Sequence, residues 1–173
     1  MGIERPFEKE RLVIGVLRSP LFARERIEEG LEGLFGRIDY RGPEFPFSWC
    51  GYYEPEMGPG LMRTFWSFSG LADPSRLAEI KRSTDALELA WAEGGGRPVN
   101  LDPGLLSLCR FSLATTKGRP HRIPLSDGIY AELTLRYESG AYRPLPWTYP
   151  DWQSPAYLAV LDELRTRLPR ESR

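Results

Sequence analysis

The chain has 173 residues, of which 41% are hydrophobic and 27% charged, ordinary values for one folded domain. Its 23 basic and 24 acidic residues give a net charge of −1, which argues against a global attraction to nucleic acid or to an anionic membrane. The longest early apolar run, Leu12–Leu17, is too short to span a bilayer, and acidic residues precede it, unlike in a signal peptide. We therefore expect a single cytoplasmic domain over residues 1–173, with an ordered core from about 11 to 168 and no membrane partner.

Hydrophobic periodicity predicts a central strand and three helices. Leu12–Leu17 is a nearly unbroken apolar run, which is typical of a strand buried on both faces. Each helix is preceded by a Ser or Asp that can cap it and by a proline suited to its first turn. The predicted helices follow Ser19, Asp73 and Ser154, and the second carries an apolar stripe over residues 77–91.

Further strands are predicted between and after these helices, at Arg37–Tyr40, Met62–Phe68, Leu106–Thr115, His121–Leu125 and Ile129–Tyr137. The last of them alternates between an apolar face and a polar face that carries Glu132. The element order is that of a split βαβ core extended by a hairpin and a final helix. We therefore predict an α+β fold in which about three helices back a largely antiparallel sheet.

Four polar and aromatic stretches are the candidate functional segments: residues 52–58, 97–104, 117–122 and 147–152. They mix carboxylates, basic groups and aromatic rings at the ends of predicted elements, where binding residues usually lie. We predict that the four stretches meet at one polar pocket.

In the second stretch, Asn100 and Asp102 are two residues apart, so in an extended segment both side chains point to one face while Leu101 turns into the core. This arrangement suits a ligand or metal pair. The equally weighted alternative is that both side chains hydrogen-bond a turn, because Asp-Pro-Gly is ordinary turn chemistry. Arg97 could bind an anionic group with its planar fork or pair with a surface carboxylate.

The third stretch places Lys117, Arg119 and Arg122 beside His121, the one histidine of the chain. Such a cluster suits a phosphate or carboxylate, and the alternative is a solvated, positively charged turn. The imidazole of His121 could act as a general acid or base.

Carboxylates recur in the other stretches and on the last strand. Glu132 faces either solvent or a cleft, and Glu54, Glu56 and Asp151 lie in the other loops. Together with Asp102, these three loop carboxylates could hold a hard cation such as Mg²⁺ through oxygen ligands, although no spacing matches a named calcium or zinc motif.

Other residues are interpreted as structural. On the second helix Lys81, Asp85 and Glu88 lie beside the apolar stripe, where we expect an exposed ion pair. Cys50 and Cys109 have no neighbouring Cys or His and are expected to be small buried hydrophobic residues. The sequence contains no P-loop, dinucleotide-binding, metalloprotease or nucleophile-elbow motif.

From Leu12 to about Leu168 the chain resembles a prokaryotic family described as domain of unknown function 4416. The resemblance rests on Tyr52-Tyr53, Glu56–Gly58, Asn100–Gly104, Lys117 with His121–Ile123, Gly128–Glu132 and Trp147–Asp151. It implies a small cytoplasmic protein. Descriptions of similar sequences as GTP-binding imply a further alternative, nucleotide binding without a P-loop.

We therefore expect a small-molecule-binding domain or an enzyme whose polar pocket takes a phosphate- or carboxylate-bearing ligand, with or without a divalent cation. The candidate catalytic residues are Asp102, Glu132 and His121. The candidate ligand-binding residues are Arg97, Asn100, Lys117, Arg122, Tyr53, Glu56, Tyr149 and Asp151. The alternative is an adaptor without catalysis, whose aromatic residues between Trp147 and Trp152 bind a protein partner. The near-neutral charge disfavours nucleic acid.

Overall fold

The computed structural model describes residues 2–169, which form a nine-stranded sheet and four α-helices. The strands are β1 (Glu10–Arg18), β2 (Ile38–Arg41), β3 (Phe45–Pro46), β4 (Met62–Ala72), β5 (Val99–Leu106), β6 (Arg110–Thr115), β7 (Ile123–Pro124), β8 (Tyr130–Glu138) and β9 (Ala141–Pro144). The helices are α1 (Arg24–Phe35), α2 (Glu54–Met57), α3 (Leu77–Ala90) and α4 (Pro155–Thr166), with single 3₁₀ turns at Pro74–Arg76 and Asp151–Gln153. None of the helices within this range is long and apolar enough to cross a membrane. The predicted α+β class is confirmed.

The sheet has the strand order β2-β4-β1-β5-β6-β8-β7, with β3 also paired to β4 and β9 also paired to β8. Every pairing within residues 2–169 is antiparallel. Because β4 lies between β1 and β2, and β1 lies between β4 and β5, both β1-α1-β2 and β4-α3-β5 are split βαβ units. The predicted split core is therefore present, and the strands from β6 onward extend it.

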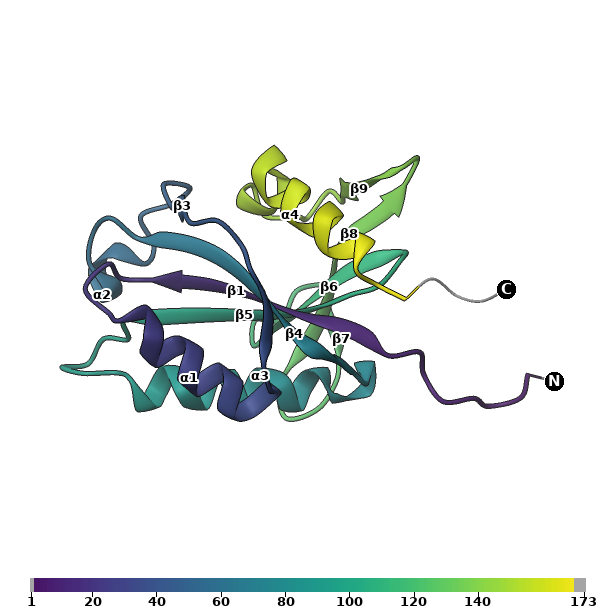
Figure 1. Cartoon of the computed structure of the whole chain (residues 1–173), viewed down its shortest axis with the longest axis horizontal. Helices are drawn as coiled ribbons and strands as arrows, with labels where there is room; N and C mark the ends of the chain where they lie inside the picture. Colours follow the sequence, from purple (N-terminus) through teal and green to yellow (C-terminus); the bar gives the residue numbers. More distant parts are fainter. Residues whose placement is uncertain (1, 170–173) are drawn as a thin grey trace.

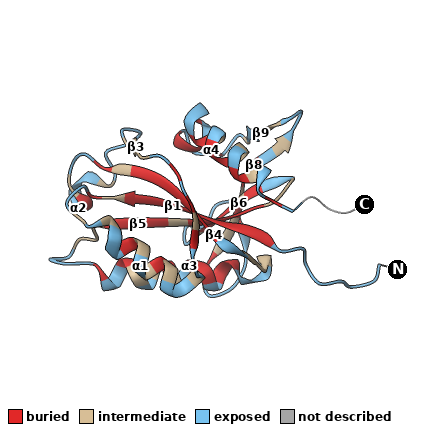
Figure 2. Cartoon of the chain, in the orientation of Figure 1, coloured by how far each residue is buried: buried red, intermediate tan, exposed pale blue. Residues whose placement is uncertain are grey.

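The sheet is covered on both faces. Figure 1 shows α1 and α3 side by side on one face and α4 on the other. In β1, Leu12, Ile14 and Val16 belong to the hydrophobic cluster under α1 and α3, whereas Val13 belongs to the cluster under α4. This alternation explains why β1 is buried along almost its whole length, as predicted for a central strand, and Figure 2 shows the same burial.

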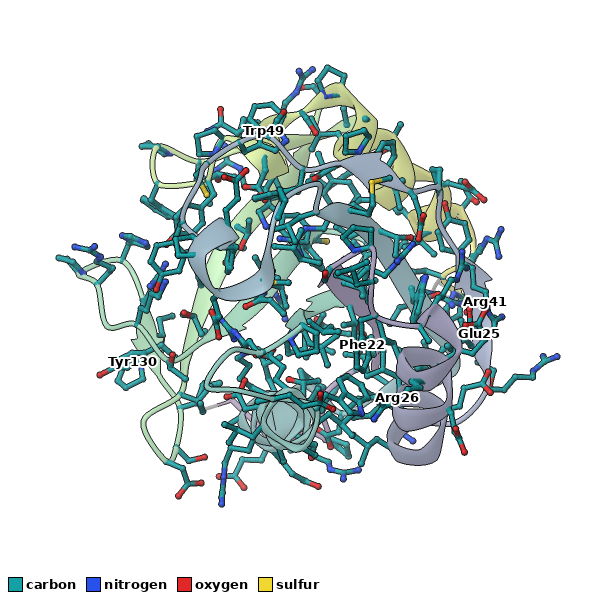
Figure 3. All side chains as sticks on the ribbon, turned by 90° about the vertical axis from the view of Figure 1, so that its left-hand side faces the viewer. Phe22, Glu25, Arg26, Arg41, Trp49 and Tyr130 are labelled. Carbon is teal, nitrogen blue, oxygen red and sulfur yellow. The ribbon has the colours of Figure 1, made fainter. Side chains whose placement is uncertain are left out.

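The two helices of the first layer pack through a glycine. A Cβ atom added to Gly30 of α1 would lie 2.6 Å from the ring of Trp91, so only glycine lets that indole ring fit against α1. The ring of Phe22 also packs against Trp91, with 5.6 Å between the ring centroids, and the guanidinium of Arg26 lies over Phe22; both residues are labelled in Figure 3.

Two of the three predicted helix starts are confirmed. Asp73 and Ser154 each accept a hydrogen bond from a backbone N–H of the turn that follows. The first predicted start is wrong, because α1 begins only at Arg24. The carbonyl of Ser19 instead accepts a hydrogen bond from the N–H of Phe22, which closes a separate turn before the helix.

The predicted strand Leu106–Thr115 contains β6 but starts too early, because it joins the last residue of β5 to β6. Residues 99–106 form β5, a turn follows at residues 107–109, and β6 begins at Arg110. The Asp-Pro-Gly sequence is thus inside a strand, and the turn alternative for Asp102 is wrong as well. A Cβ on Gly104 would lie 2.5 Å from the ring of Phe111, so this glycine serves the close approach of β6 rather than a turn.

The predicted alternation along β8 holds only as far as a bulge. Ile129 and Ala131 both pack in the cluster under α1 and α3, as expected for alternate residues on the apolar face of a strand. The register with β6 then shifts, and Leu135 joins the cluster on the opposite face of the sheet. As a result Thr134 is fully buried and Leu133 is only half-buried, while the polar neighbour Glu132 faces a cleft described below.

Both cysteines are exposed, which contradicts the predicted burial. Cys109 lies in the turn between β5 and β6, and Cys50 lies in the loop before α2. The tendency of free cysteines to be buried did not hold here, because the tertiary fold places both in connecting segments.

Candidate functional site

A cleft opens where β5 and β6 separate. The two strands pair only over Gly104–Leu106, and the residues Val99–Pro103 of β5 pair only with β1. Beyond Leu113, β6 follows β8 instead, with Ala114 and Thr115 paired to Ala131 and Tyr130. The space between the diverging strands is part of a cleft of about 880 Å³. Residues from both faces of the sheet therefore line it.

Most of the residues singled out in the sequence face this cleft. All four polar stretches contribute to its lining, and the predicted site residues that line it are Tyr53, Glu56, Arg97, Asn100, Asp102, Lys117, Arg122, Glu132, Tyr149 and Asp151. His121 does not line the cleft and contacts Glu132 from the side. The structure thus brings the predicted residues together, while their roles stay predictions.

One of the lining residues is a buried arginine. The side chain of Arg63, on β4, is 2% exposed, and its Nη1 donates a 2.8 Å hydrogen bond to Oδ2 of Asp102. Its Nη2 lies 3.9 Å from Oδ2 of Asp151. β1 lies between β4 and β5, so Arg63 must reach over β1 to contact Asp102. A Cβ on Gly15 of β1 would lie 3.1 Å from Nη1, and the glycine therefore leaves room for the guanidinium above β1.

The two carboxyl groups beside Arg63 differ in proton affinity. Burial raises the pKa of Asp102, but the positive charges of Arg63 and Lys81 outweigh burial and hold that pKa below its usual value. For Asp151 burial is the larger effect, and its pKa is raised although Arg63 opposes the shift. Neighbouring carboxyl groups whose pKa values move apart are a common feature of acid–base sites.

Side chains of α3 close the open edge of β5. Nζ of Lys81 donates a 3.0 Å hydrogen bond to the carbonyl of Leu101, and Oε1 of Glu88 accepts a 2.6 Å hydrogen bond from its N–H. Lys81 also pairs with Asp85 at 2.7 Å, and Arg97 pairs with Glu88. The predicted exposed ion pair is therefore wrong, because Lys81 and Glu88 are buried and replace a strand partner.

Arg122, another lining residue, links β8, the loop after β6 and the loop after β9. Its Nε donates to Oε2 of Glu132 at 2.7 Å, Nη1 donates to the carbonyl of Lys117 at 2.6 Å, and Nη2 donates to the hydroxyl of Tyr149 at 3.2 Å. Nε2 of His121 lies 3.1 Å from the same Glu132 oxygen. Glu132 is therefore held between two basic side chains, an arrangement that favours positioning the loop over catalysis.

Three donors in the lining form no hydrogen bond of normal length. Nδ2 of Asn100 and Nε of Arg63 are buried and lack such a bond within residues 2–169, although Asn100 lies near Asp102 and Arg63 near Tyr157. Lys117 forms no ion pair with any described carboxylate, and its Nζ lies 4.9 Å from the centre of the Tyr52 ring. By contrast, Arg97 contacts Glu56 at 3.0 Å as well as Glu88. Asn100, Arg63 and Lys117 thus have hydrogen-bonding capacity that a ligand could use.

Exposed aromatic rings surround the mouth of the cleft. Trp49, Tyr52 and Tyr149 line it and are 47%, 65% and 46% exposed. Figure 3 shows Trp49 on the loop between β3 and α2. These rings present flat apolar surfaces next to the polar interior.

No metal site accompanies these groups. Within the part of the chain that the structure describes, no three His, Cys, Asp or Glu side chains are grouped so that they could hold a metal ion. The carboxylates in question are bound by basic side chains instead, as Asp102 is by Arg63 and Glu56 by Arg97. Within residues 2–169, the carboxylates considered as Mg²⁺ ligands therefore do not form such a group.

Sequence reasoning missed Arg63, Lys81 and Glu88. A signal existed for Arg63, which is a charged residue inside the otherwise apolar predicted strand Met62–Phe68. Lys81 and Glu88 are seven residues apart, which places them two helical turns apart on one face, beside the apolar stripe. A pair at this position is suited to reach the neighbouring sheet rather than solvent.

The fold and the site define an α+β domain with a split βαβ core and a charged cleft cut into its sheet. The family model described as Domain of unknown function (DUF4416) matches residues 8–168, and the chain belongs to this family. The match includes every strand, every helix and all segments that line the cleft. No curated protein and no solved structure matches the chain.

Proposed function

We propose that this protein binds a small ligand that carries a phosphate or carboxylate group, in the cleft between β5 and β6. The observation that carries the proposal is the buried Nδ2 of Asn100, a lining residue, which forms no hydrogen bond of normal length among residues 2–169 and lies close enough to Asp102 only to help lower the pKa of that carboxyl group. An unpaired buried donor costs about 1–3 kcal/mol, and an oxyanion would supply the missing acceptor. Nε of Arg63 likewise forms no hydrogen bond of normal length within these residues, although the Arg63 side chain lies beside the Tyr157 hydroxyl and acts to lower its pKa.

The charges in the cleft are compatible with an anion. The lining has six carboxylates against five cationic side chains, but each of the six forms an ion pair with an arginine or lysine, which limits the repulsion of a negative ligand. Lys117 forms no ion pair with a carboxylate among the described residues. Its backbone is held in place because its carbonyl accepts a hydrogen bond from Arg122. Lys117 is therefore the cation best placed to meet an incoming anion.

The rim supports a ligand with an apolar or planar remainder. Trp49, Tyr52 and Tyr149 would pack against such a group while its acidic end reaches Asn100. A cleft of about 880 Å³ has the size of small-molecule sites, which favours a ligand over the adaptor alternative. Nucleotide binding without a P-loop, for example of GTP, stays an alternative within the same site, and so does catalysis on the bound ligand.

A thermal-shift screen tests the proposal. The ligands are inorganic phosphate, sugar phosphates, nucleotides and small carboxylic acids, and at 100 times its Kd a ligand of the native state stabilises it by about 2.7 kcal/mol. We expect at least one of them to raise the Tm. We expect Lys117→Ala to lose most of that rise, while Lys9→Ala, an exposed lysine outside the cleft, responds like the parent. The proposal fails if no anion raises the Tm or if both variants respond equally.

A further inference from the structure

We infer that an oxyanion in the cleft binds together with a proton on Asp151, whose neutral carboxyl group then donates a hydrogen bond to the ligand. This inference rests on the proposed function and names the residue that would carry a proton at that site. It goes beyond anion binding, because it makes the cleft a place where a proton is held next to the bound group.

The first support is the unequal position of the two carboxyl groups around Arg63. Asp102 receives a direct 2.8 Å hydrogen bond from Nη1, whereas Asp151 lies 3.9 Å from Nη2, which is too far for one. Asp151 is only 8% exposed, lines the cleft and receives no hydrogen bond from a side chain within residues 2–169. Among these residues Asp151 accepts hydrogen bonds only from backbone N–H groups, so of the two it is the carboxyl group that no side chain holds in its ionised form by a hydrogen bond.

The second support is that Asp151 is held rigidly. It opens the 3₁₀ turn Asp151–Gln153, and the next residue, Trp152, packs its ring 5.2 Å from Phe65 and 5.0 Å from Phe111. Trp152 is 3% exposed. This aromatic cluster fixes the backbone that carries the carboxyl group, which is itself buried and therefore poorly hydrated.

The groups that face Asp151 come from several elements. Arg63 on β4 favours its ionised form, Asp102 on β5 disfavours it, and the N–H of Trp152 favours it, while burial outweighs them and raises the pKa. Tyr157 on α4 also lies near, and burial first, then Asp151, act to raise its own pKa to about 12, against the charge of Arg63. Tyr157 therefore stays neutral, and Asp151 is the group that titrates.

A bound oxyanion would act on Asp151 in one direction. The negative charge of the oxyanion disfavours an ionised Asp151, and the oxyanion also competes with Asp151 for the positive charge of Arg63. Both effects raise the pKa of Asp151 on binding. A group whose pKa is higher in the complex takes up a proton as the complex forms. Affinity is then greatest at low pH and falls as the pH rises through the pKa of the complex, by at most about tenfold per pH unit for one proton.

Sulfate is the probe, because it keeps its charge over the range in which carboxyl groups titrate. Its Kd is measured by calorimetry from the ordinary aspartate pKa of about 3.9 up to neutral pH. In the parent we expect the Kd to increase with pH, and in Asp151→Asn we expect this dependence to disappear. Asp85→Asn, which removes a carboxylate of the same cleft that pairs with Lys81, is the matched control and should keep the dependence.

A second measurement needs no variant. The carboxyl carbon of Asp151 is followed by NMR in the parent during a pH titration, with and without sulfate, and its pKa should be higher with sulfate. If sulfate binds but Asp151→Asn keeps the pH dependence, or the pKa of Asp151 does not rise, the inference is wrong and the proposed function stands. If sulfate, phosphate and carboxylates bind at no pH, both fail.

Discussion

Replacing Arg63 by Met should destabilise the protein by about 3–5 kcal/mol at neutral pH, the usual cost of removing one partner of a buried ion pair. The side chain of Arg63 is 2% exposed and that of Asp102 is 27% exposed, so water can restore only part of the lost solvation. The change also leaves Asp151 without its nearest cation. Because small domains are stable by about 5–15 kcal/mol, the loss is a large fraction of the total.

The effect of Arg63→Met should depend on pH. In the parent, Arg63 and Lys81 lower the pKa of Asp102 against the effect of burial, so its contribution to stability is present above the unfolded-state pKa and is lost as the pH falls through the folded-state value. Without Arg63 the largest favourable charge is gone, burial prevails, and the pKa of Asp102 rises. The ionised form then costs stability, and the difference between variant and parent shrinks as the pH is lowered.

Urea unfolding at neutral pH and near pH 5 measures both quantities, with the m-value checking that the transition stays two-state. Arg136→Met is the control, because Arg136 is 57% exposed and pairs with Glu138 at the surface, where about 1 kcal/mol or less is expected. A loss below about 1 kcal/mol for Arg63→Met, or an equal loss at both pH values, would refute the electrostatic reasoning.

Two packing predictions concern the sheet and α3. Gly104→Ala should cost about 1–3 kcal/mol, because the new Cβ would lie 2.9 Å from the backbone oxygen of Ser112, which cannot yield as a side chain would. Gly33→Ala, in α1 with open space around it, should instead stabilise by roughly 0.5–1 kcal/mol, and urea midpoints showing the same sign for both would contradict this account. Leu87→Ala should cost about 2 kcal/mol, the low end for a leucine core truncation, because Leu87 is partly buried against the α1–α3 cluster. Leu89→Ala, 76% exposed, should cost less than about 0.5 kcal/mol, and equal unfolding midpoints would show that the α3 packing is misjudged.

Much of the fold was predictable from local patterns. The apolar run Leu12–Leu17 indicated the central strand, and Asp73 and Ser154 indicated the starts of the later helical segments. The strand β5 was not predictable in the same way, since its Asp-Pro-Gly sequence has the composition of a turn. Pro103 is tolerated there because β5 has only β1 as a strand partner at that point, a fact of tertiary structure that no local pattern contains.

The candidate site was predictable as a set of segments but not as a network. Composition drew attention to the loops that carry Lys117 and Asp151, and these do face one cleft. It did not indicate Arg63 as the shared partner of two carboxylates, because residue spacing predicts which face a side chain takes and not which side chain it meets. The same limit applies to Lys81 and Glu88, whose burial depends on where α3 crosses the sheet.

The way in which α3 closes the edge of β5 has a consequence for solubility. An open strand edge offers free N–H and C=O groups, which invite pairing with the strand of another molecule. At Leu101 both groups are already occupied by Glu88 and Lys81, and at the neighbouring position of the same edge Pro103 has no N–H to offer. The two strands can therefore separate in the middle of the sheet without presenting a free edge at these positions as a template for aggregation.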